Sequence, residues 1–181
     1  HDTIAVMLNK VLDIAPDNAA ARLQLIQYAW EKKDYNQAIV LCKPAIEYNP
    51  DEMAFFYYLG MAYYLNNNLD DALNTFRKGT GVINAQSDPS LVSDYYGLMG
   101  DILHTKGEEA SAFAADDSCL QWKDNNVPCL NNYAYYLSEK GKNLDKAEQM
   151  SYKTIKAEPK NSTYLDTYAW ILFLQKRYEA A

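Results

Sequence analysis

Turn-forming residues are scarce in this sequence, which contains 7 glycines and 6 prolines among 181 residues. A fold built of many short strands needs such residues at every turn, so their scarcity argues against an all-β protein. Apolar residues make up 49% of the chain and charged residues 23%, which is the balance of a globular protein with a buried core. The composition therefore favours a helical fold.

A long apolar run and a basic run are also missing. No window holds 18 uninterrupted apolar residues, so the sequence predicts no insertion into a membrane. The formal net charge is −7, and lysine and arginine are spread along the chain without a cluster. Because nucleic-acid binding needs a positively charged patch, we expect no nucleic-acid partner. The first residues lack the charged and then apolar layout of a signal peptide, which leaves targeting open.

Cysteine and histidine are too few and too widely spaced to indicate a metal site. The three cysteines, Cys42, Cys119 and Cys129, form no CxxC pair and have no histidine at ligand spacing. We expect them to be small buried residues. No connection has the pattern of a phosphate-binding loop or a calcium loop. The sequence therefore predicts no metal and no cofactor.

An internal repeat is the main feature that the sequence does have. Ala38 and Ala72 lie 34 residues apart (72 − 38), and Pro16 and Pro50 are separated by the same distance (50 − 16). After a half repeat at 1–16, we expect repeats to start near residues 19, 53, 93, 127 and 162, with the last repeat truncated. The third start is six residues late, which places an insertion near 86–90. The prediction is one solenoid over 1–181, and its apolar ends indicate a piece of a longer protein.

Two positions of the repeat are almost always small. With Ala38 counted as position 20, nine of the ten residues at positions 8 and 20 are alanine or glycine. Antiparallel helices approach closely only where their crossing carries little side chain, so these positions mark the crossing of two helices in each repeat. Position 8 is occupied by Ile26, Gly60, Gly100, Ala134 and Ala169, and position 20 by Ala38, Ala72, Ala112, Ala147 and Ala181.

These features resemble the tetratricopeptide repeat family over essentially the whole chain. Leu59 and Gly60, followed at the family's spacing by Tyr63, Ala72 and Phe76, carry its signature. The resemblance implies an all-α fold, the right-handed α-α superhelix of a tetratricopeptide solenoid. The helices are expected near 2–14, 18–32, 35–48, 52–67, 69–83, 90–106, 108–123, 127–140, 144–157 and 161–175.

Two residues depart from the family pattern. Asp116 occupies position 24 of the third repeat, which is normally aromatic or apolar, and Ile26 is large at position 8. A carboxylate at a packed position costs free energy unless it is paired. We therefore expect the second helix of the third repeat to be shifted or loosely packed.

The sequence shows no catalytic constellation. Apart from His1, the only histidine is His104, with Asp101 three residues earlier on the same face of a helix. Catalysis needs a nucleophile, a base and an orienting group within reach of one another. We interpret His104 and Asp101 as part of a solvated polar face, and the sequence predicts that the chain is not an enzyme.

The resemblance also implies where a partner would bind. In this family the first helix of each repeat lines a concave groove, and positions 2, 5, 9, 12 and 13 point into it. Here these positions are aromatic and acidic, and aromatic residues are enriched in interface cores. The alternative, that the aromatic rings pack between helices, stays open. The predicted groove residues are Gln27, Trp30, Glu31, Tyr57, Met61, Tyr64, Asp94, Asp101, His104, Asn131, Tyr135 and Trp170.

One specialisation of the family is disfavoured. Members that grip a C-terminal carboxylate use lysine, arginine and asparagine at positions 2, 5, 6 and 9. In the first three repeats the corresponding residues include no lysine or arginine, so a carboxylate clamp is not expected. They are Leu23, Gln27, Tyr58, Asp94 and Leu98.

The sequence thus favours an interaction scaffold that binds a protein or peptide partner in its groove. The alternative is an accessory repeat array of a larger protein whose catalytic or sensory domain lies outside this sequence. The apolar terminal repeats also allow self-association. Localisation stays open, although the run at 130–137 resembles bacterial members of the family and favours the cell envelope.

Cys119 and Cys129 flank the predicted turn between the third and fourth repeats, so we expect them to lie close together. Whether they form a disulfide stays open. A bridge requires Cα atoms within roughly 7 Å of each other and an oxidising compartment.

Overall fold

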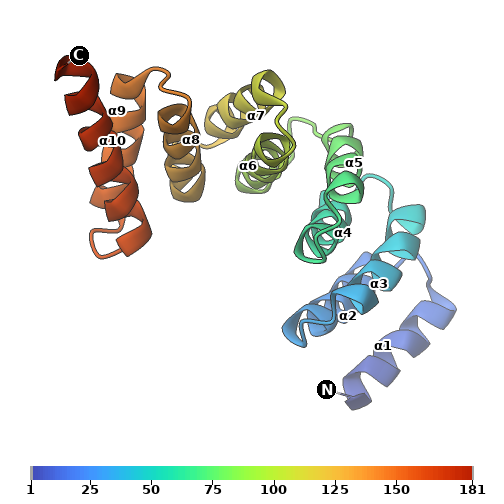
Figure 1. Cartoon of the computed structure of the whole chain (residues 1–181). Helices are drawn as coiled ribbons and strands as arrows, with labels where there is room; N and C mark the ends of the chain where they lie inside the picture. Colours follow the sequence, from blue (N-terminus) through green and yellow to red (C-terminus); the bar gives the residue numbers. More distant parts are fainter. Residues whose placement is uncertain (1, 181) are drawn as a thin grey trace. The chain divides into compact units, whose positions relative to one another are not determined.

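The computed structural model describes the backbone of residues 2–180 and the side chains of residues 2–177. Ala181, the expected small residue of the fifth repeat, lies outside this part of the chain. The described residues form helices and no strand, as predicted (Figure 1). The helices are α1 (Asp2–Ile14), α2 (Ala19–Glu31), α3 (Tyr35–Tyr48), α4 (Met53–Leu65), α5 (Leu69–Thr80), α6 (Pro89–Thr105), α7 (Glu109–Trp122), α8 (Val127–Glu139), α9 (Leu144–Ala157) and α10 (Ser162–Ala180).

The chain divides into two compact units, His1–Ser87 and Asp88–Ala181. Each unit is a stack of helices in which every helix packs on the next one along the chain. The division falls in the connection between α5 and α6, where the sequence carries its insertion. That the two units continue as one solenoid over 1–181 remains a prediction.

Each helix pair turns back on itself at a residue in the left-handed conformation. Lys33, Asn67, Gly107 and Gly141 have φ angles of 56°, 59°, 78° and 62°. All four are position 15 of their repeats, so the same backbone turn recurs at the same place. Glycine and asparagine adopt this conformation readily, whereas lysine does so at a cost.

Asparagine and aspartate side chains start many of the helices. The side-chain oxygens of Asn18, Asp34, Asp88 and Asn126 accept hydrogen bonds from backbone N–H groups in the first turn of α2, α3, α6 and α8. These bonds satisfy donors that a helix cannot pair internally, so they fix where the first and second helices begin.

The crossing of the two helices in a repeat is tight, as the small residues predict. An ideal Cβ atom on Gly60 would lie 2.5 Å from a ring carbon of Phe76. On Gly100 it would overlap a carboxylate oxygen of Asp116. Phe76 and Asp116 are both position 24 of their repeats, so position 24 fills the space that position 8 leaves empty.

In the first repeat the large residue is at position 8 and the small one at position 24. Ile26 is large at position 8, and Cys42 is small at position 24. Both are completely buried and belong to one core cluster with Phe55 and Leu59. The departure of Ile26 from the family pattern is therefore compensated across the crossing.

The expectation of a loosely packed third repeat is wrong. Asp116 is 1% exposed, and α6 and α7 pack against each other more extensively than any other pair of described helices. Gly100 leaves room for the Asp116 carboxylate, and His104 pairs with it at 2.8 Å. A buried carboxylate is tolerated because it has both space and a partner.

The last helix is longer than predicted. A turn was expected after residue 175, but α10 continues to Ala180 and includes Lys176, the position 15 residue of this repeat. Residues 175–177 are glutamine, lysine and arginine, which favour a helix and contain no residue suited to the left-handed conformation. Lys33 adopts that conformation where α3 packs back against α2.

Helix α1 has no buried residue and packs on α2. Its exposed apolar side chains include Ile4, Val6, Met7 and Ile14, and Ile14 is 88% exposed. Self-association through this surface remains a prediction.

Replacing Lys33 with glycine should stabilise the protein. Glycine removes the cost of the left-handed conformation at this exposed turn, so we expect the free energy of unfolding to rise by about 0.5–1 kcal/mol in urea titrations. Lys32→Gly is the control, because Lys32 has a φ of −80° and gains nothing from glycine. Equal effects of the two substitutions would contradict the strain at Lys33.

Replacing Gly60 with alanine should destabilise the protein by about 1–3 kcal/mol, because the new methyl group would overlap the Phe76 ring. Thermal and urea unfolding measure this loss. The control is Gly97→Ala, whose added Cβ atom meets its nearest neighbour, the Cys119 sulfur, at 3.4 Å. If Gly97→Ala costs as much as Gly60→Ala, the tight crossing does not explain the small residue.

Candidate partner-binding surface

The first helices of the repeats lie beside one another within each unit. In unit 1, α2 contacts α4, and in unit 2, α8 contacts both α6 and α10. We call the surface formed by α2 and α4 the first-helix face of unit 1, and that formed by α6, α8 and α10 the first-helix face of unit 2. All the predicted groove residues belong to these five helices.

The first-helix face of unit 1 is aromatic and partly buried. Trp30 meets Tyr58 edge to face, with ring centroids 5.4 Å apart, and Tyr58 in turn contacts Tyr57 at 5.8 Å. These spacings are those of favourable aromatic pairs. Trp30 and Tyr57 are half-buried, as are Met61 and Tyr64. The rings therefore pack against their neighbours and still keep some surface exposed.

Two polar residues flank these rings. Gln27 and Glu31 are both exposed on α2, one turn apart on the helix that carries Trp30. The face of unit 1 thus combines aromatic surface with one carboxylate.

The first-helix face of unit 2 has more open aromatic residues. Tyr135 on α8 is 40% exposed, and its hydroxyl donates to Glu139 at 2.8 Å. Trp170 on α10 is 42% exposed and stacks on Phe173, with centroids 5.7 Å apart. Phe173 is itself exposed and occupies position 12 of its repeat, one of the positions that the resemblance assigns to the groove.

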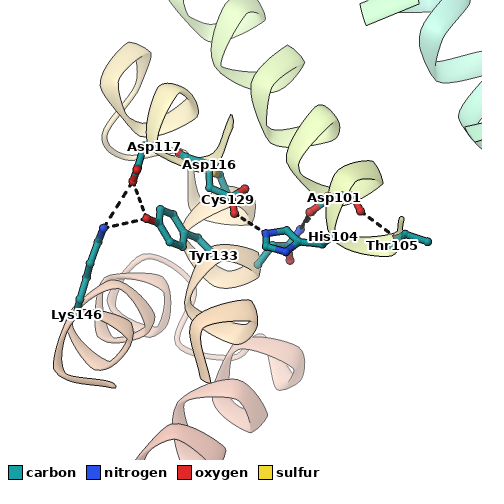
Figure 2. A network of polar contacts seen from close by, with 9 residues as sticks. Asp101, His104, Thr105, Asp116, Asp117, Cys129, Tyr133 and Lys146 are labelled. Atoms are coloured by element: carbon teal, nitrogen blue, oxygen red, sulfur yellow. Dashed lines mark hydrogen bonds and ion pairs between the residues drawn. The ribbon is translucent and has the colours of Figure 1, made fainter. Parts of the chain in front are cut away.

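His104 does not form the solvated polar face that its sequence context indicated. Its side chain is only 5% exposed, and its Nε2 atom is hydrogen-bonded to the Asp116 carboxylate at 2.8 Å, which Figure 2 shows from close by. The imidazole stacks on Tyr136 with centroids 3.6 Å apart and meets the edge of Phe113 at 4.8 Å. His104 thus joins α6, α7 and α8 in the interior of unit 2.

Asp101 lies beside His104 and Asp116 and is half-buried. The side-chain amide of Asn132 donates to both of its oxygens, at 3.3 and 3.2 Å. Burial, and then the nearby charge of Asp116, raise the pKa of Asp101 to about 6, while hydrogen bonds from Asn132 and Tyr136 oppose the shift. Asp101 is therefore a carboxyl group that changes charge close to neutral pH.

Asp94 and Asn131 complete the predicted set and differ strongly in exposure. Asp94 is exposed and accepts a hydrogen bond from Asn126 at 3.1 Å, and burial of its carboxyl group raises its pKa. Asn131 is 5% exposed, and its Oδ1 atom has no hydrogen-bond partner. Asn131 is thus part of the interior and offers no surface to a partner.

Sequence reasoning missed a second polar network on the other side of α8. Tyr133 donates to Asp117 at 2.6 Å, and Lys146 donates to the Tyr133 hydroxyl at 3.0 Å (Figure 2). Lys146 also pairs with Asp117 at 3.6 Å. Burial, followed by the bond to Asp117, raises the pKa of Tyr133. This network connects α7, α8 and α9. The only indication of it in the sequence was a second carboxylate, Asp117, next to the unusual Asp116.

The described residues contain no group of three or more histidine, cysteine, aspartate or glutamate side chains placed to hold a metal ion. Within the same part of the chain, no helix is long and apolar enough to cross a membrane. A cleft of about 360 Å³ in unit 1 opens between the second helices α3 and α5, with Lys43, Phe56, Tyr63 and Lys78 among its lining residues. Phe56, Leu59 and Tyr63 of the first helix α4 also line it, but none of the predicted groove residues does.

Comparison with known proteins identifies the class of this fold. The tetratricopeptide repeat family model matches residues 29–84, which run from the end of α2 through α5. Together with the repeated helix pairs of both units, this match confirms the resemblance to the tetratricopeptide repeat family. The predicted all-α tetratricopeptide solenoid fold is confirmed.

Several solved structures have the same fold at low sequence identity. A crystal structure of MamA protein superposes with a TM-score of 0.71 at 16% identity, over 87% of this chain and 82% of that one. YrrB, described as a TPR protein with an unusual peptide-binding site, gives 0.69 at 13% identity, over 93% and 92%. TTC0263, a thermophilic TPR protein of Thermus thermophilus, gives 0.66 at 19% identity, over 93% and 89%. A search of curated protein sequences found no significant match.

Replacing Asp101 with asparagine should stabilise the protein at high pH. The pKa of Asp101 is higher in the folded protein than its ordinary value of 3.8, so its contribution to stability is fully present below about pH 4 and is lost as pH rises through about 6. Asparagine keeps a side-chain acceptor and removes the charge. We expect a gain of about 1–3 kcal/mol in the free energy of unfolding at pH 8 that shrinks toward pH 4.

The control for this titration is Asp166→Asn, which removes an exposed carboxylate from α10 on the same face. Urea unfolding across the pH range should show no comparable gain for it. A gain for Asp101→Asn that does not depend on pH would contradict the assignment of the effect to ionisation.

Proposed function

We propose that the chain is a binding scaffold whose first-helix faces hold an extended segment of a partner protein. The observation that carries this proposal is the exposure of Tyr135 and Trp170, at 40% and 42%, on the neighbouring helices α8 and α10. Large aromatic rings that remain open to solvent on one face of a soluble protein are typical of an interaction surface.

Aromatic residues would provide most of the affinity. Tyrosine and tryptophan are enriched among the few residues that dominate binding energies, because a rigid ring buries a large area at a small cost in conformational entropy. Trp170 and Phe173 form a stacked pair that offers a continuous apolar surface. In unit 1, the half-buried Trp30, Tyr57 and Tyr64 offer less area, which makes unit 2 the stronger candidate.

Charge indicates the chemistry of the partner. The tetratricopeptide resemblance assigns five positions in each of five repeats to the groove, and these twenty-five positions contain five acidic residues and no lysine or arginine. Such a surface attracts a basic segment and repels an acidic one, which mainly affects association rate and specificity. The acidic residues are Glu31, Asp94, Asp101, Glu139 and Asp166.

The fold supports the same proposal in a general way. YrrB, which shares the fold, is described as having a peptide-binding site. Tetratricopeptide repeats stack helix pairs into extended surfaces suited to binding. In this chain His104, the only histidine among the described residues and so the residue type best suited to act as a general base, is hydrogen-bonded to Asp116 in the interior with a side chain that is 5% exposed. We therefore propose that the protein acts by binding and not by catalysis.

Peptide selection tests this proposal. A phage-displayed library of random linear peptides, selected against the full chain, should yield sequences rich in lysine or arginine and in apolar residues. Binding of a selected peptide, measured by calorimetry, should weaken by about 1–3 kcal/mol in Trp170→Ala and in Tyr135→Ala. Raising the salt concentration should weaken it further, because the surface charges are exposed.

Tyr152→Ala is the matched control, because Tyr152 is 48% exposed but lies on the second helix α9. Its loss should leave peptide binding unchanged. The proposal fails if the library yields no binding peptide, or if Tyr152→Ala weakens binding as much as the two substitutions on the first-helix face. Circular dichroism verifies that each variant is folded.

A further inference from the structure

Two buried cysteines in unit 2 have no role in the proposed binding surface. Cys119 lies in the last turn of α7 and Cys129 in the first turn of α8, and they are 0% and 4% exposed. The four-residue connection at 123–126 joins these helices. Both residues are free thiols in the structure.

The two thiols lie side by side, as their places in the sequence predicted. The Cys129 sulfur lies 4.0 Å from the carbonyl oxygen of Asp116, which is three residues before Cys119 on α7. An ideal Cβ atom on Gly97 would lie 3.4 Å from the Cys119 sulfur and 4.0 Å from the Cys129 Cβ atom, so both cysteines border the same small gap on α6. Asn126 also touches both: its Nδ2 atom is 3.5 Å from the Cys119 sulfur, and its Oδ1 atom accepts from the Cys129 N–H at 3.2 Å.

Polar groups surround Cys119 and distinguish it from an inert buried thiol. The Ser93 hydroxyl lies 3.3 Å from its sulfur and donates to its carbonyl oxygen at 2.8 Å. The Asn126 amide donates to the same hydroxyl at 2.9 Å. Hydrogen bonds from Cys129 and then Ser93 lower the pKa of Cys119 against the effect of burial, whereas the bond to Cys119 and burial raise the pKa of Cys129. The contacts of the Ser93 hydroxyl and the Asn126 amide with the Cys119 sulfur thus favour Cys119 as the attacking sulfur.

We propose that Cys119 and Cys129 form a redox-active dithiol that hydrogen peroxide converts to an intramolecular disulfide. The Cys119 thiolate attacks one oxygen of the peroxide, the O–O bond breaks, and the products are a sulfenic acid and, after protonation, water. The Cys129 sulfur then attacks the Cys119 sulfur, the S–OH bond breaks, and the proton of the Cys129 thiol passes to the departing hydroxyl group, which leaves as a second water. Overall, two thiols and one peroxide give one disulfide and two waters.

Burial of the two sulfurs limits the reaction to small oxidants but does not prevent it. Hydrogen peroxide is nearly as small as water, and it can reach the thiols when the connection at 123–126 opens locally. Asp124 and Asn125 in this connection are exposed, so such an opening mainly breaks the hydrogen bonds that the buried Asn126 makes to Ser93, Asp94 and Cys129. The disulfide would then join the end of α7 to the start of α8, next to Asn126, the residue that caps α8.

Cys42 provides an internal comparison. It is as buried as Cys119 but lies in unit 1 among Ile26, Ala45 and Phe55, with no second thiol. Burial raises its pKa to about 12, so almost no thiolate exists at neutral pH. The same concentration of peroxide should therefore leave Cys42 reduced.

The experiment uses the full chain, reduced and then freed of reductant. After exposure to hydrogen peroxide and removal of the excess with catalase, the protein is denatured and its thiols are counted. We expect a fall from three thiols to one, a loss of about 2 Da in the intact mass, and a non-reduced peptide that links Cys119 to Cys129. Dithiothreitol should restore three thiols. Cys42→Ala should lose both of its thiols on oxidation.

A second variant tests whether Cys119 is the thiol that peroxide oxidises first. In Cys129→Ser the sulfenic acid has no thiol to react with, so dimedone should label Cys119. Three thiols remaining in the oxidised wild-type protein, a disulfide between two chains, or modification of Cys42 before the other two would each overturn the proposal. Peptide mapping of the wild-type protein shows which thiols have reacted even if Cys129→Ser does not fold.

Discussion

The close crossing of two antiparallel helices is the constraint on which the rest of the structure depends. At the crossings of the first three repeats, position 8 of the first helix and position 24 of the second share one fixed space. Phe76 fills this space opposite Gly60, and Asp116 fills it opposite Gly100. In the first repeat Ile26 fills it opposite Cys42. Because protein interiors are packed as densely as organic crystals, neither residue of such a pair can change size alone.

In unit 2 this constraint also determines the chemistry of the surface. Gly100 makes room for a carboxylate where the second repeat has a phenylalanine ring, and the carboxylate of Asp116 holds His104 in the interior at 2.8 Å. The charge of Asp116 also contributes to the raised pKa of Asp101 on the first-helix face. A residue on a second helix therefore influences a surface formed by first helices.

The repeat made much of the fold predictable, because a spacing of 34 residues, small residues at the crossings and turn-forming residues at position 15 act locally. The turn predicted after residue 175 is absent, because Lys176 and its neighbours favour a helix. Lys33, at the same position of the first repeat, does adopt the turn conformation. The candidate surface was only partly predictable. Position in the repeat assigned Tyr135 and Trp170 to the groove, and both are exposed. It could not show that His104 turns inward toward Asp116, since that depends on a partner twelve residues away in another helix.

If positions 8 and 24 share one space, a natural pair of residues can be moved from one repeat to another. Urea unfolding would compare Gly60→Ile with the double variant Gly60→Ile/Phe76→Cys, which copies the Ile26 and Cys42 pair into the second repeat. The account predicts that the double variant is more stable than Gly60→Ile alone, even though it has lost a buried ring, because the cysteine makes room for the isoleucine. A double variant no more stable than Gly60→Ile would contradict it.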